Sequence, residues 1–186
     1  MPATPAMAPA MTKVCETPRL LLRHFALTDA EFILHLLNEP SFIRYIADKG
    51  VRTLDDARTY LETGPLASYA AYGFGLNLIA LKDSGVPIGM CGILKREHLP
   101  EPDLGYALLP EYWSRGYALE AALAIISQAR QVIRLPRLLA VTDADNGSSI
   151  RLLEKSGFRF AHPLRLAENE SDLKLFELEV LPSALA

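Results

Sequence analysis

The chain contains 186 residues, of which 50% are hydrophobic and 22% charged; its 19 basic and 22 acidic side chains give a net charge of −3. This length suits a single domain that buries most of its apolar surface. The slight negative charge argues against nucleic acid as a partner, because binding to a phosphate backbone needs a basic surface. No apolar run approaches the ~20 residues that span a bilayer, so we expect no membrane partner.

The cysteines and histidines do not indicate a disulfide or a metal site. Cys15 and Cys91 are the only cysteines, and we interpret both as free thiols in a reducing compartment, the cytoplasm. The histidines are scattered, without the spacing of metal ligands, at His24, His35, His98 and His162. We therefore predict a cytoplasmic protein without a metal.

The N-terminal residues 1–13 are mostly alanine, proline and methionine, with no charge before Lys13. A secretory signal needs a basic start and a continuous apolar core, and this segment has neither. We predict a disordered tail over residues 1–15 and one domain over residues 16–186, with Met11 as an alternative start.

The first half of the domain has signals for a strand, two helices and a hairpin. Residues 19–25 read as a strand, and capping boxes at Thr28–Glu31 and Thr53–Asp56 predict two helix starts, the second helix stopping at Gly64. The apolar residues within 40–50 belong either to the core or to the mouth of a site. Residues 74–81 and 86–94 form a predicted hairpin around the polar link 82–85, followed by a polar loop at 95–102.

The second half is centred on residues 104–133, which read as strand, turn and helix. The strand 104–109 ends at Pro110. In the helix that follows the turn, one face carries apolar side chains at 3.6-residue spacing up to Ile133. A strand at 138–142 follows, then a helix that opens at Asn146 or Ser148 and ends at Gly157. Strands beginning at 158 and spanning 173–180 complete an α+β fold around a mostly antiparallel sheet.

The turn Tyr112–Ala118 is a candidate anion site. The first backbone N–H groups of a helix have no intrahelical partners, and the positive end of the helix dipole lies beside them. Gly116 allows an unusual backbone conformation or a close approach by a ligand, and Ala118 is small. The alternative is a helix start that meets only water.

Three segments together carry a family resemblance. Leu-Gly-Tyr at 104–106, Pro-Glu-Tyr-Trp-Ser-Arg-Gly-Tyr-Ala at 110–118 and Asn-Gly-Ser-Ser-Ile-Arg-Leu-Leu-Glu-Lys-Ser-Gly-Phe at 146–158 resemble the GNAT acetyltransferases. The resemblance covers roughly residues 17–180 and is closest to the branch containing the ribosomal-protein N-terminal acetyltransferases. It implies a three-layer α/β/α sandwich around a mixed, mostly antiparallel sheet with two splayed parallel central strands, 104–109 and 138–142.

The resemblance also implies acetyl-CoA as cosubstrate, with its pyrophosphate in the turn and its pantetheine arm between the splayed strands. Trp113 stands where the family usually has Gln or Arg, and Ser114 where this branch often has glycine. The cofactor-binding residues implied by the resemblance are Ala107, Leu108, Leu109, Trp113, Ser114, Arg115, Gly116, Tyr117, Ala118 and Asn146.

Acetyl transfer to an amine needs a deprotonated amine, stabilisation of the carbonyl oxygen and a proton for the departing thiolate. Neither cysteine lies in a nucleophile motif, which favours direct attack without a covalent enzyme intermediate. Many family members place a tyrosine acid where this chain has Leu153. The resemblance therefore gives Ser149 the role of proton donor or thiol-orienting group, with a helix-capping serine as the alternative.

Asp103 precedes the Leu-Gly-Tyr segment, where the branch usually has glutamate. The resemblance implies that this carboxylate, acting through water, takes the proton of the acceptor ammonium. The alternative is an exposed loop carboxylate without a role, and nearby candidates for the base are Glu97, Glu101 and His98.

The resemblance implies an acetyl-CoA-dependent N-acetyltransferase whose acceptor is a primary amine, and the N-terminal α-amine of a protein is one candidate. The alternatives are a small amine, such as an antibiotic or a polyamine, and a non-catalytic domain that binds acetyl-CoA. The net negative charge favours basic peptides through modest long-range steering, but it would steer small cationic amines equally well.

Overall fold

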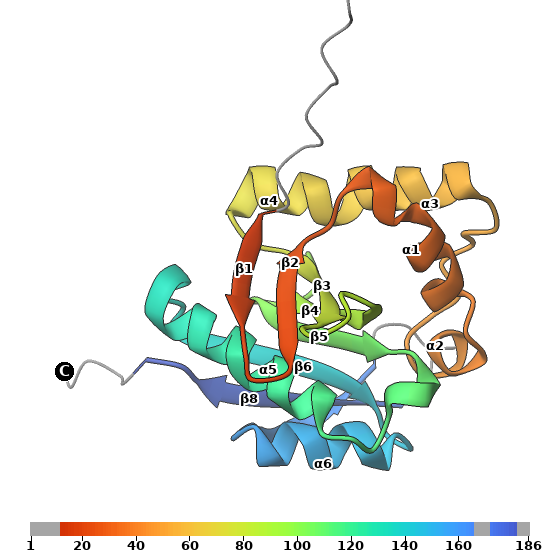
Figure 1. The fold of residues 1–186 in the computed structure, drawn as a ribbon. Coiled ribbons are helices and arrows are strands. Elements are labelled where there is room, and N and C mark those ends of the chain that lie inside the picture. Colours follow the sequence, from red (N-terminus) through yellow and green to blue (C-terminus); the bar gives the residue numbers. More distant parts are fainter. Residues whose placement is uncertain (1–11, 166–171, 182–186) are drawn as a thin grey trace, which may run out of the picture.

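The computed structural model describes residues 12–165 and 172–181, which form one eight-stranded sheet with helices on both faces (Figure 1). The sheet order is β1-β2-β3-β4-β5-β6-β8-β7, and every neighbouring pair is antiparallel except β5 and β6. The strands are β1 (Lys13–Glu16), β2 (Leu20–His24), β3 (Leu76–Leu81), β4 (Pro87–Leu94), β5 (Asp103–Leu108), β6 (Arg137–Asp143), β7 (Arg159–Leu164) and β8 (Leu173–Glu179). The predicted fold class is confirmed.

The strand β1 was not expected, because Lys13–Cys15 fall within the predicted tail. It pairs antiparallel with β2, and Cys15 packs against the core between β1 and the helix that follows β5. The expected tail residues 1–11 lie outside the described residues. The ordered domain therefore begins at least three residues earlier than the predicted boundary.

Four helices, α1 (Ala30–Leu37), α2 (Pro40–Tyr45), α3 (Leu54–Leu61) and α4 (Ala67–Tyr72), cover one face of the sheet (Figure 1). The predicted capping box at Thr28 is wrong. A 3₁₀ turn, Leu27–Asp29, comes first, and the Asp29 carboxylate accepts the Ala26 N–H and pairs with Arg23 at 2.7 Å. The side chain that organises this turn is therefore Asp29.

The capping box at Thr53 is confirmed: its hydroxyl accepts the Asp56 N–H, and the Asp56 carboxylate accepts the Thr53 N–H. The predicted stop at Gly64 is wrong. The helix continues through a π-helical turn, Glu62–Leu66, into α4 and ends only at Gly73, whose φ is +74°. The wider turn accommodates Pro65, which has no N–H to donate.

The other face carries α5 (Tyr117–Gln128), extended by a π-helical turn Ala129–Ile133, and α6 (Gly147–Lys155). Between the sheet and these helices lies the larger core cluster, with Ala122, Ile125 and Phe176 among its fully buried members. A second cluster fills the space beneath α1–α4, around Ile33, Leu37 and Leu78. The molecule is thus the three-layer sandwich that the resemblance implies.

The β3–β4 hairpin agrees with expectation. Residues 82–85 connect the strands, and the Leu81 N–H donates to the Val86 carbonyl. A Cβ on Gly89 would overlap the backbone of Ala107, and one on Gly92 would overlap that of Gly75. These glycines allow β4 to pack closely between its neighbours, which fixes the position of β5.

No helix among the described residues is long and apolar enough to cross a membrane.

Candidate active site

The connection between β5 and α5 forms an open cradle of backbone N–H groups. It begins with a 3₁₀ turn, Pro110–Tyr112, and continues through Ser114, with φ +58°, and Gly116, with φ +80°, which is the N-cap of α5. Positive φ is routine for glycine but costs roughly 1–2 kcal/mol for other residues, so Ser114 is strained. No side chain caps the helix start, which leaves its first N–H groups available to an anion.

Not every backbone N–H group of this turn is available to an anion. The Trp113 N–H donates to the Pro110 carbonyl and is therefore occupied. The indole N–H of Trp113 donates to the Leu108 carbonyl over 2.8 Å, although the side chain is 46% exposed. Trp113 thus braces the turn against the end of β5, and the free N–H groups begin at Ser114.

Arg19 holds the cradle from the other side and was not predicted as a site residue. Its Nη1 donates to the Arg115 carbonyl over 2.9 Å, and its Nε donates to Glu120 over 2.7 Å. Its guanidinium carbon lies 4.4 Å from the centre of the Tyr117 ring. A Cβ on Gly116 would lie 3.2 Å from Nη2 of Arg19, so this glycine also leaves space for the clamp. A lone arginine before a strand carries no sequence signal for this role.

Glu120 completes this clamp on the first turn of α5. Besides Arg19 it accepts the Thr17 hydroxyl over 2.6 Å and the Arg19 backbone N–H over 3.0 Å. Burial works to raise the pKa of Glu120, but these hydrogen bonds and the Arg19 charge outweigh it and lower the pKa below its usual value. Arg115, expected to add charge to the phosphates, has its guanidinium 5.8 Å from the Tyr112 ring.

The strands β5 and β6 are parallel and splayed. Their register contains one pair, Asp103 with Leu139, and the Leu139 N–H donates to the Pro102 carbonyl over 2.9 Å. Beyond this point each strand has lost the other as a partner. The splayed arrangement that the resemblance implies is therefore present.

Alternate residues of a strand direct their backbone groups to opposite neighbours. The Leu109 N–H donates to the Ile88 carbonyl in β4, which places this N–H and the backbone groups of Ala107 on the β4 side, while the Leu109 carbonyl accepts the Tyr112 N–H. The backbone groups of Tyr106 and Leu108 face the gap instead. For contacts through the backbone, the gap thus offers the groups of Tyr106 and the N–H of Leu108, whose carbonyl accepts the Trp113 indole N–H. The expected Ala107 and the Leu109 N–H are engaged in the sheet.

Asn146 and Ser149 lie at the start of α6, where the gap opens. The Asn146 side chain caps the helix by accepting the Ser149 N–H over 3.1 Å. The helix is thus opened by Asn146, not by Ser148, and the Ser149 hydroxyl has no capping role. That hydroxyl lies 2.7 Å from the Tyr106 hydroxyl, and Leu153 is 1% exposed within the core.

Tyr106 belongs to the Leu-Gly-Tyr segment, but no pattern in the sequence assigned it a role. Its phenol is enclosed between β5 and α6, and burial raises its pKa well above the usual value, although the hydrogen bond with Ser149 works in the opposite direction. It therefore stays protonated at neutral pH. The sequence did contain one indication of its surroundings, because Tyr106 shares a strand face with Leu104 and Leu108.

Asp103 is buried, not an exposed loop carboxylate. Its side chain is 1% exposed, and Arg96 Nε lies 3.2 Å from Oδ1 without the alignment of a hydrogen bond. Within residues 12–165 and 172–181, neither carboxylate oxygen receives a hydrogen bond. Burial raises the pKa of Asp103 to about 6, and the Arg96 charge opposes that rise. The competing candidates Glu97 and His98 are exposed.

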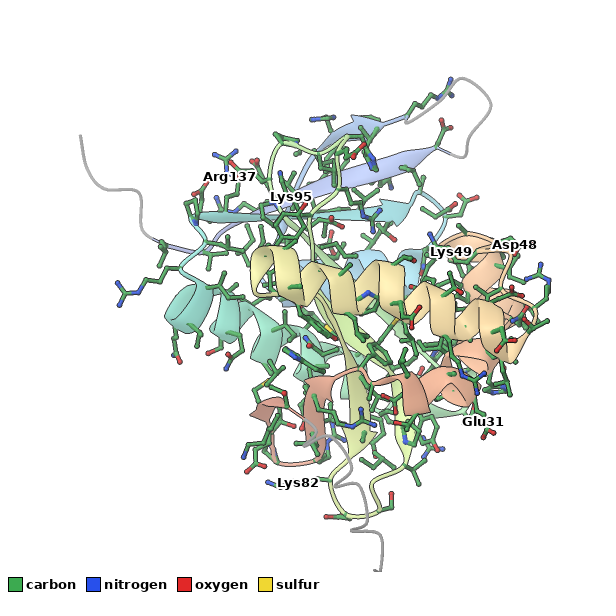
Figure 2. All side chains as sticks on the ribbon, turned by 90° about the horizontal axis from the view of Figure 1, so that it is seen from above. Glu31, Asp48, Lys49, Lys82, Lys95 and Arg137 are labelled. Atoms are coloured by element: carbon green, nitrogen blue, oxygen red, sulfur yellow. The ribbon has the colours of Figure 1, made fainter. Side chains whose placement is uncertain are left out.

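Arg96, the counter-charge of this carboxylate, also acts on Lys49 and on the phenol of Tyr60. Burial, and after it the charge of Arg96, lowers the pKa of Lys49. Burial raises the pKa of Tyr60 in α3, and the charge of Arg96 acts in the opposite direction. Figure 2 looks onto the face covered by α1–α4 and labels Lys49 and Lys95 along the stretch α3–α4. In the segment 40–50, Phe42 is core, whereas Ile43 and Ile46 are exposed.

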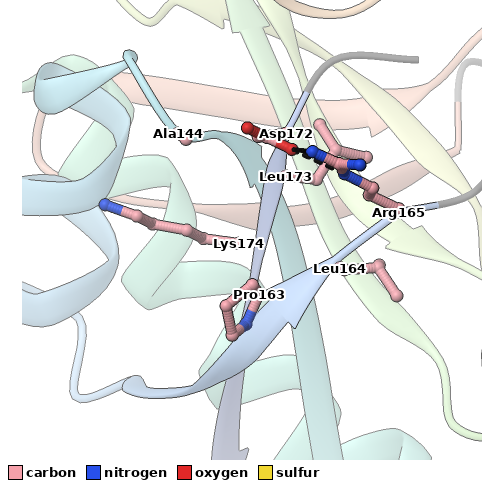
Figure 3. A pocket seen from close by; sticks show the side chains of 7 residues that line it. All are labelled: Ala144, Pro163, Leu164, Arg165, Asp172, Leu173 and Lys174. Atoms are coloured by element: carbon pink, nitrogen blue, oxygen red, sulfur yellow. Dashed lines mark hydrogen bonds and ion pairs between the residues drawn. The ribbon is translucent and has the colours of Figure 1, made fainter. Parts of the chain in front are cut away.

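A separate hollow of about 470 Å³ lies where β6 ends beside the β7–β8 hairpin (Figure 3). Arg165 and Asp172 form an ion pair of 2.7 Å at its edge. None of the predicted site residues lines it, although Ala144 does so two positions before Asn146.

Among the described residues no cluster of His, Cys, Asp and Glu suits a metal, and both cysteines are free.

An open helix start, a splayed strand pair and a hydroxyl at the end of the gap define the site of an acyltransferase that uses a coenzyme A thioester. Residues 19–159 match the acetyltransferase (GNAT) domain family. The uncharacterized N-acetyltransferase YoaA of Bacillus subtilis (strain 168) is 30% identical over 157 residues, which cover 83% of this chain and 88% of that protein. The chain therefore belongs to the GNAT acetyltransferases.

Solved structures agree with this assignment. An acetyltransferase from Agrobacterium tumefaciens str. C58 superposes with a TM-score of 0.75 at 25% identity, over 95% of this chain and 99% of that one. The ribosomal L7/L12 alpha-N-protein acetyltransferase RimL, in complex with coenzyme A, has the same fold, with a TM-score of 0.79 at 15% identity over 90% and 97% of the two chains. The chain is thus an acetyl-CoA-dependent N-acetyltransferase, and the reading as a non-catalytic domain is set aside.

Proposed function

We propose that this enzyme acetylates the N-terminal α-amine of a peptide or protein, with Asp103 as the base. The observation that carries the proposal is the buried Asp103 carboxylate, which has no hydrogen-bond partner among the described residues and a pKa of about 6. A buried carboxylate without hydrogen bonds is costly, and such groups concentrate at functional sites. An incoming ammonium, directly or through water, would supply the missing donor.

The strength of this base suits an α-amine. An α-amine has a pKa near 8 and a lysine side chain one near 10.4, so at neutral pH the α-amine is free in a far larger fraction. A base with a pKa of about 6 is adequate for the first and weak for the second. The fold shared with RimL, whose name states an α-N-protein substrate, supports the same choice.

Acetyl-CoA would supply an activated acetyl thioester at the end of the gap. The N–H groups from Ser114 onward and the clamp of Arg19 suit the pyrophosphate, and the gap-facing backbone of Tyr106 and the Leu108 N–H suit the pantetheine amides. Asp103 takes one proton of the incoming ammonium, and the free amine nitrogen attacks the acetyl carbon. The C–S bond then breaks with its electron pair on sulfur, and the nitrogen loses a second proton as the amide forms, which balances the proton that the thiolate takes up. The Ser149 hydroxyl stabilises that thiolate until it is protonated.

The local charge modifies the expectation drawn from the net charge. Net charge favoured basic acceptors, but Arg96 lies beside Asp103 and repels additional cations. A polyamine carries several charges into this region, whereas a peptide can place one α-amine there. We therefore rank a peptide acceptor above spermidine-like amines and above cationic antibiotics.

The test compares four acceptors by release of free coenzyme thiol. They are a peptide with a free N-terminus and no lysine, the same peptide N-blocked and carrying lysine, spermidine, and an aminoglycoside. We expect turnover with the first alone. Acetylation confined to the other three would overturn the acceptor assignment. A cytoplasmic location remains a prediction, supported by the two free thiols.

A further inference from the structure

The Ser149 hydroxyl can stabilise a thiolate only if its proton points at sulfur. A serine hydroxyl rotates freely, and in α6 it can also turn back toward a backbone carbonyl. Its orientation therefore has to be fixed by a neighbour. The capping bond from Asn146 positions the Ser149 backbone N–H but leaves the hydroxyl undirected.

We propose that Tyr106 is the positioning residue for Ser149: its phenol donates to the Ser149 hydroxyl oxygen and thereby turns the serine proton toward the thiol end of the gap. The two hydroxyl oxygens are 2.7 Å apart, and the Tyr106 hydroxyl is 3.4 Å from the Ser149 carbonyl oxygen. That carbonyl can only accept, so the phenol proton lies among acceptors. Tyr106 is also enclosed, which keeps the phenol protonated and therefore a donor.

The arrangement explains how the chain functions without the family's tyrosine in α6. Leu153 occupies that position and is buried in the core, so no hydroxyl can come from there. The phenol comes instead from β5, whose gap-facing backbone is itself a candidate for contacts with pantetheine. One residue would thus connect the strand that binds the arm with the helix that carries the serine.

No proton needs to leave Tyr106 in this scheme. As the C–S bond breaks, the electron pair stays on sulfur, and the Ser149 O–H donates a hydrogen bond to the thiolate. The thiolate then takes up one proton, which balances the proton that the amine has lost. Tyr106 acts only through Ser149, which distinguishes it from a catalytic acid.

The inference rests on the proposed role of Ser149 and can be tested without an acceptor. A hydrogen bond donated to a thiolate lowers the pKa of the thiol. We expect the thiol of bound coenzyme A, titrated by ultraviolet absorbance of the thiolate, to have a lowered pKa in the wild type. A charge-assisted hydrogen bond corresponds to a shift of about one unit, which Ser149→Ala should abolish.

Tyr106→Phe keeps the ring and removes the donor, and we expect it to lose at least half of that shift. On the Ser149→Ala background it should change nothing further, since the two residues act as a unit. In turnover, Tyr106→Phe should lower kcat about tenfold or more while leaving KM for acetyl-CoA nearly unchanged. Tyr106→Met, which fills much of the ring's space without a hydroxyl, should raise the thiol pKa in the same way.

The matched control is Tyr69→Phe, which removes another enclosed phenol far from the gap. The Tyr69 hydroxyl donates to the Leu76 carbonyl and accepts the Phe25 N–H over 3.1 Å. We expect this variant to lose stability but to retain kcat and the thiol pKa. A Tyr106→Phe protein that titrates like the wild type, or effects of Tyr106→Phe and Ser149→Ala that add, would overturn the proposal. If Tyr106→Phe does not fold, an unchanged thiol pKa in Tyr106→Met would overturn it.

Acceptor identity and thiol orientation can fail separately. If no peptide is acetylated, the titration still reports on Tyr106 and Ser149. If instead Ser149→Ala leaves the thiol pKa unchanged, the role of Ser149 is wrong, whichever amine is the acceptor.

Discussion

At the scale of single residues, Asp103 shows a conflict between stability and the proposed chemistry. It begins β5 with its side chain 1% exposed, and among the described residues its ion-pair partner is Arg96 at 3.2 Å. An ionised carboxylate without hydrogen bonds destabilises the folded state, whereas the protonated form fits the site. Because the pKa is about 6 in the folded chain and near 3.9 when unfolded, protonation favours folding.

We expect Asp103→Asn to raise the free energy of unfolding at pH 7 by about 2–3 kcal/mol, from ~2 pKa units at 1.36 kcal/mol each. The wild type loses this stability as pH rises from about 4 through about 6, so the two proteins should converge in acid. The same variant should lose activity and the limb of the pH–rate profile near 6. The measurements are urea unfolding and kcat/KM across pH 4–8, with the exposed Asp83→Asn as control. A variant less stable than the wild type at pH 7 would contradict the burial argument.

At the scale of elements, the sequence predicted correctly the features that depend only on residues close together in the chain. The capping box at Thr53 and the hairpin link 82–85 depend on a few neighbouring residues and were predicted correctly. The start of α1 depends on Asp29 and Arg23 from the preceding strand, and the passage through Gly64 depends on a π-helical turn. Both features depend on contacts outside the local pattern. The short strand β1 does so too, because it is formed by pairing with β2.

The same reasoning separates the predicted from the unpredicted parts of the site. The turn around Gly116 has a local signature and was found from the sequence. The roles of Arg19 and Tyr106 arise when β2 meets α5 and when β5 meets α6, so no spacing along the chain reveals them. The division of β5 into gap-facing and sheet-facing backbone groups also required the register with β4.

The clamp between β2 and α5 yields a second prediction. We expect Arg19→Ala to weaken acetyl-CoA binding by about tenfold, because the Arg115 carbonyl loses its donor and the turn is released. Since 46% of the Arg19 side chain is exposed, solvent screens its pair with Glu120, and the loss of stability should be only about 1 kcal/mol. Calorimetric titration and thermal unfolding measure the two effects.

The control is Arg137→Ala, which breaks exposed ion pairs with Glu177 and Glu179 in β8. Arg137 is the first residue of β6 (Figure 2). This variant should leave acetyl-CoA affinity unchanged. Equal affinities in Arg19→Ala and Arg137→Ala would remove Arg19 from the binding site and leave it a structural residue.

At the scale of the whole molecule, the sheet consists of two parts joined by a short seam. Strands β1–β5 are continuous, as are β6, β8 and β7, but β5 and β6 share only the pair Asp103–Leu139. The seam leaves backbone groups of β5 without strand partners along the gap. A ligand in the gap would therefore complete the sheet, in the manner of an added strand.

Hydrogen exchange of individual amides tests this arrangement. At acetyl-CoA concentrations about 100 times Kd, ligand binding can slow exchange through local opening on the order of 100-fold. We expect that slowing at Leu108 and Tyr106, whose backbone groups face the gap, and little change at Leu109 and Ala107, which already bond to β4. The amides of β3 serve as the reference for global stabilisation. Slowing at Leu109 and Ala107 with none at Leu108 and Tyr106 would mean that the arm does not lie along this edge of β5, whereas equal slowing of all four and of β3 would reduce the effect to global stability.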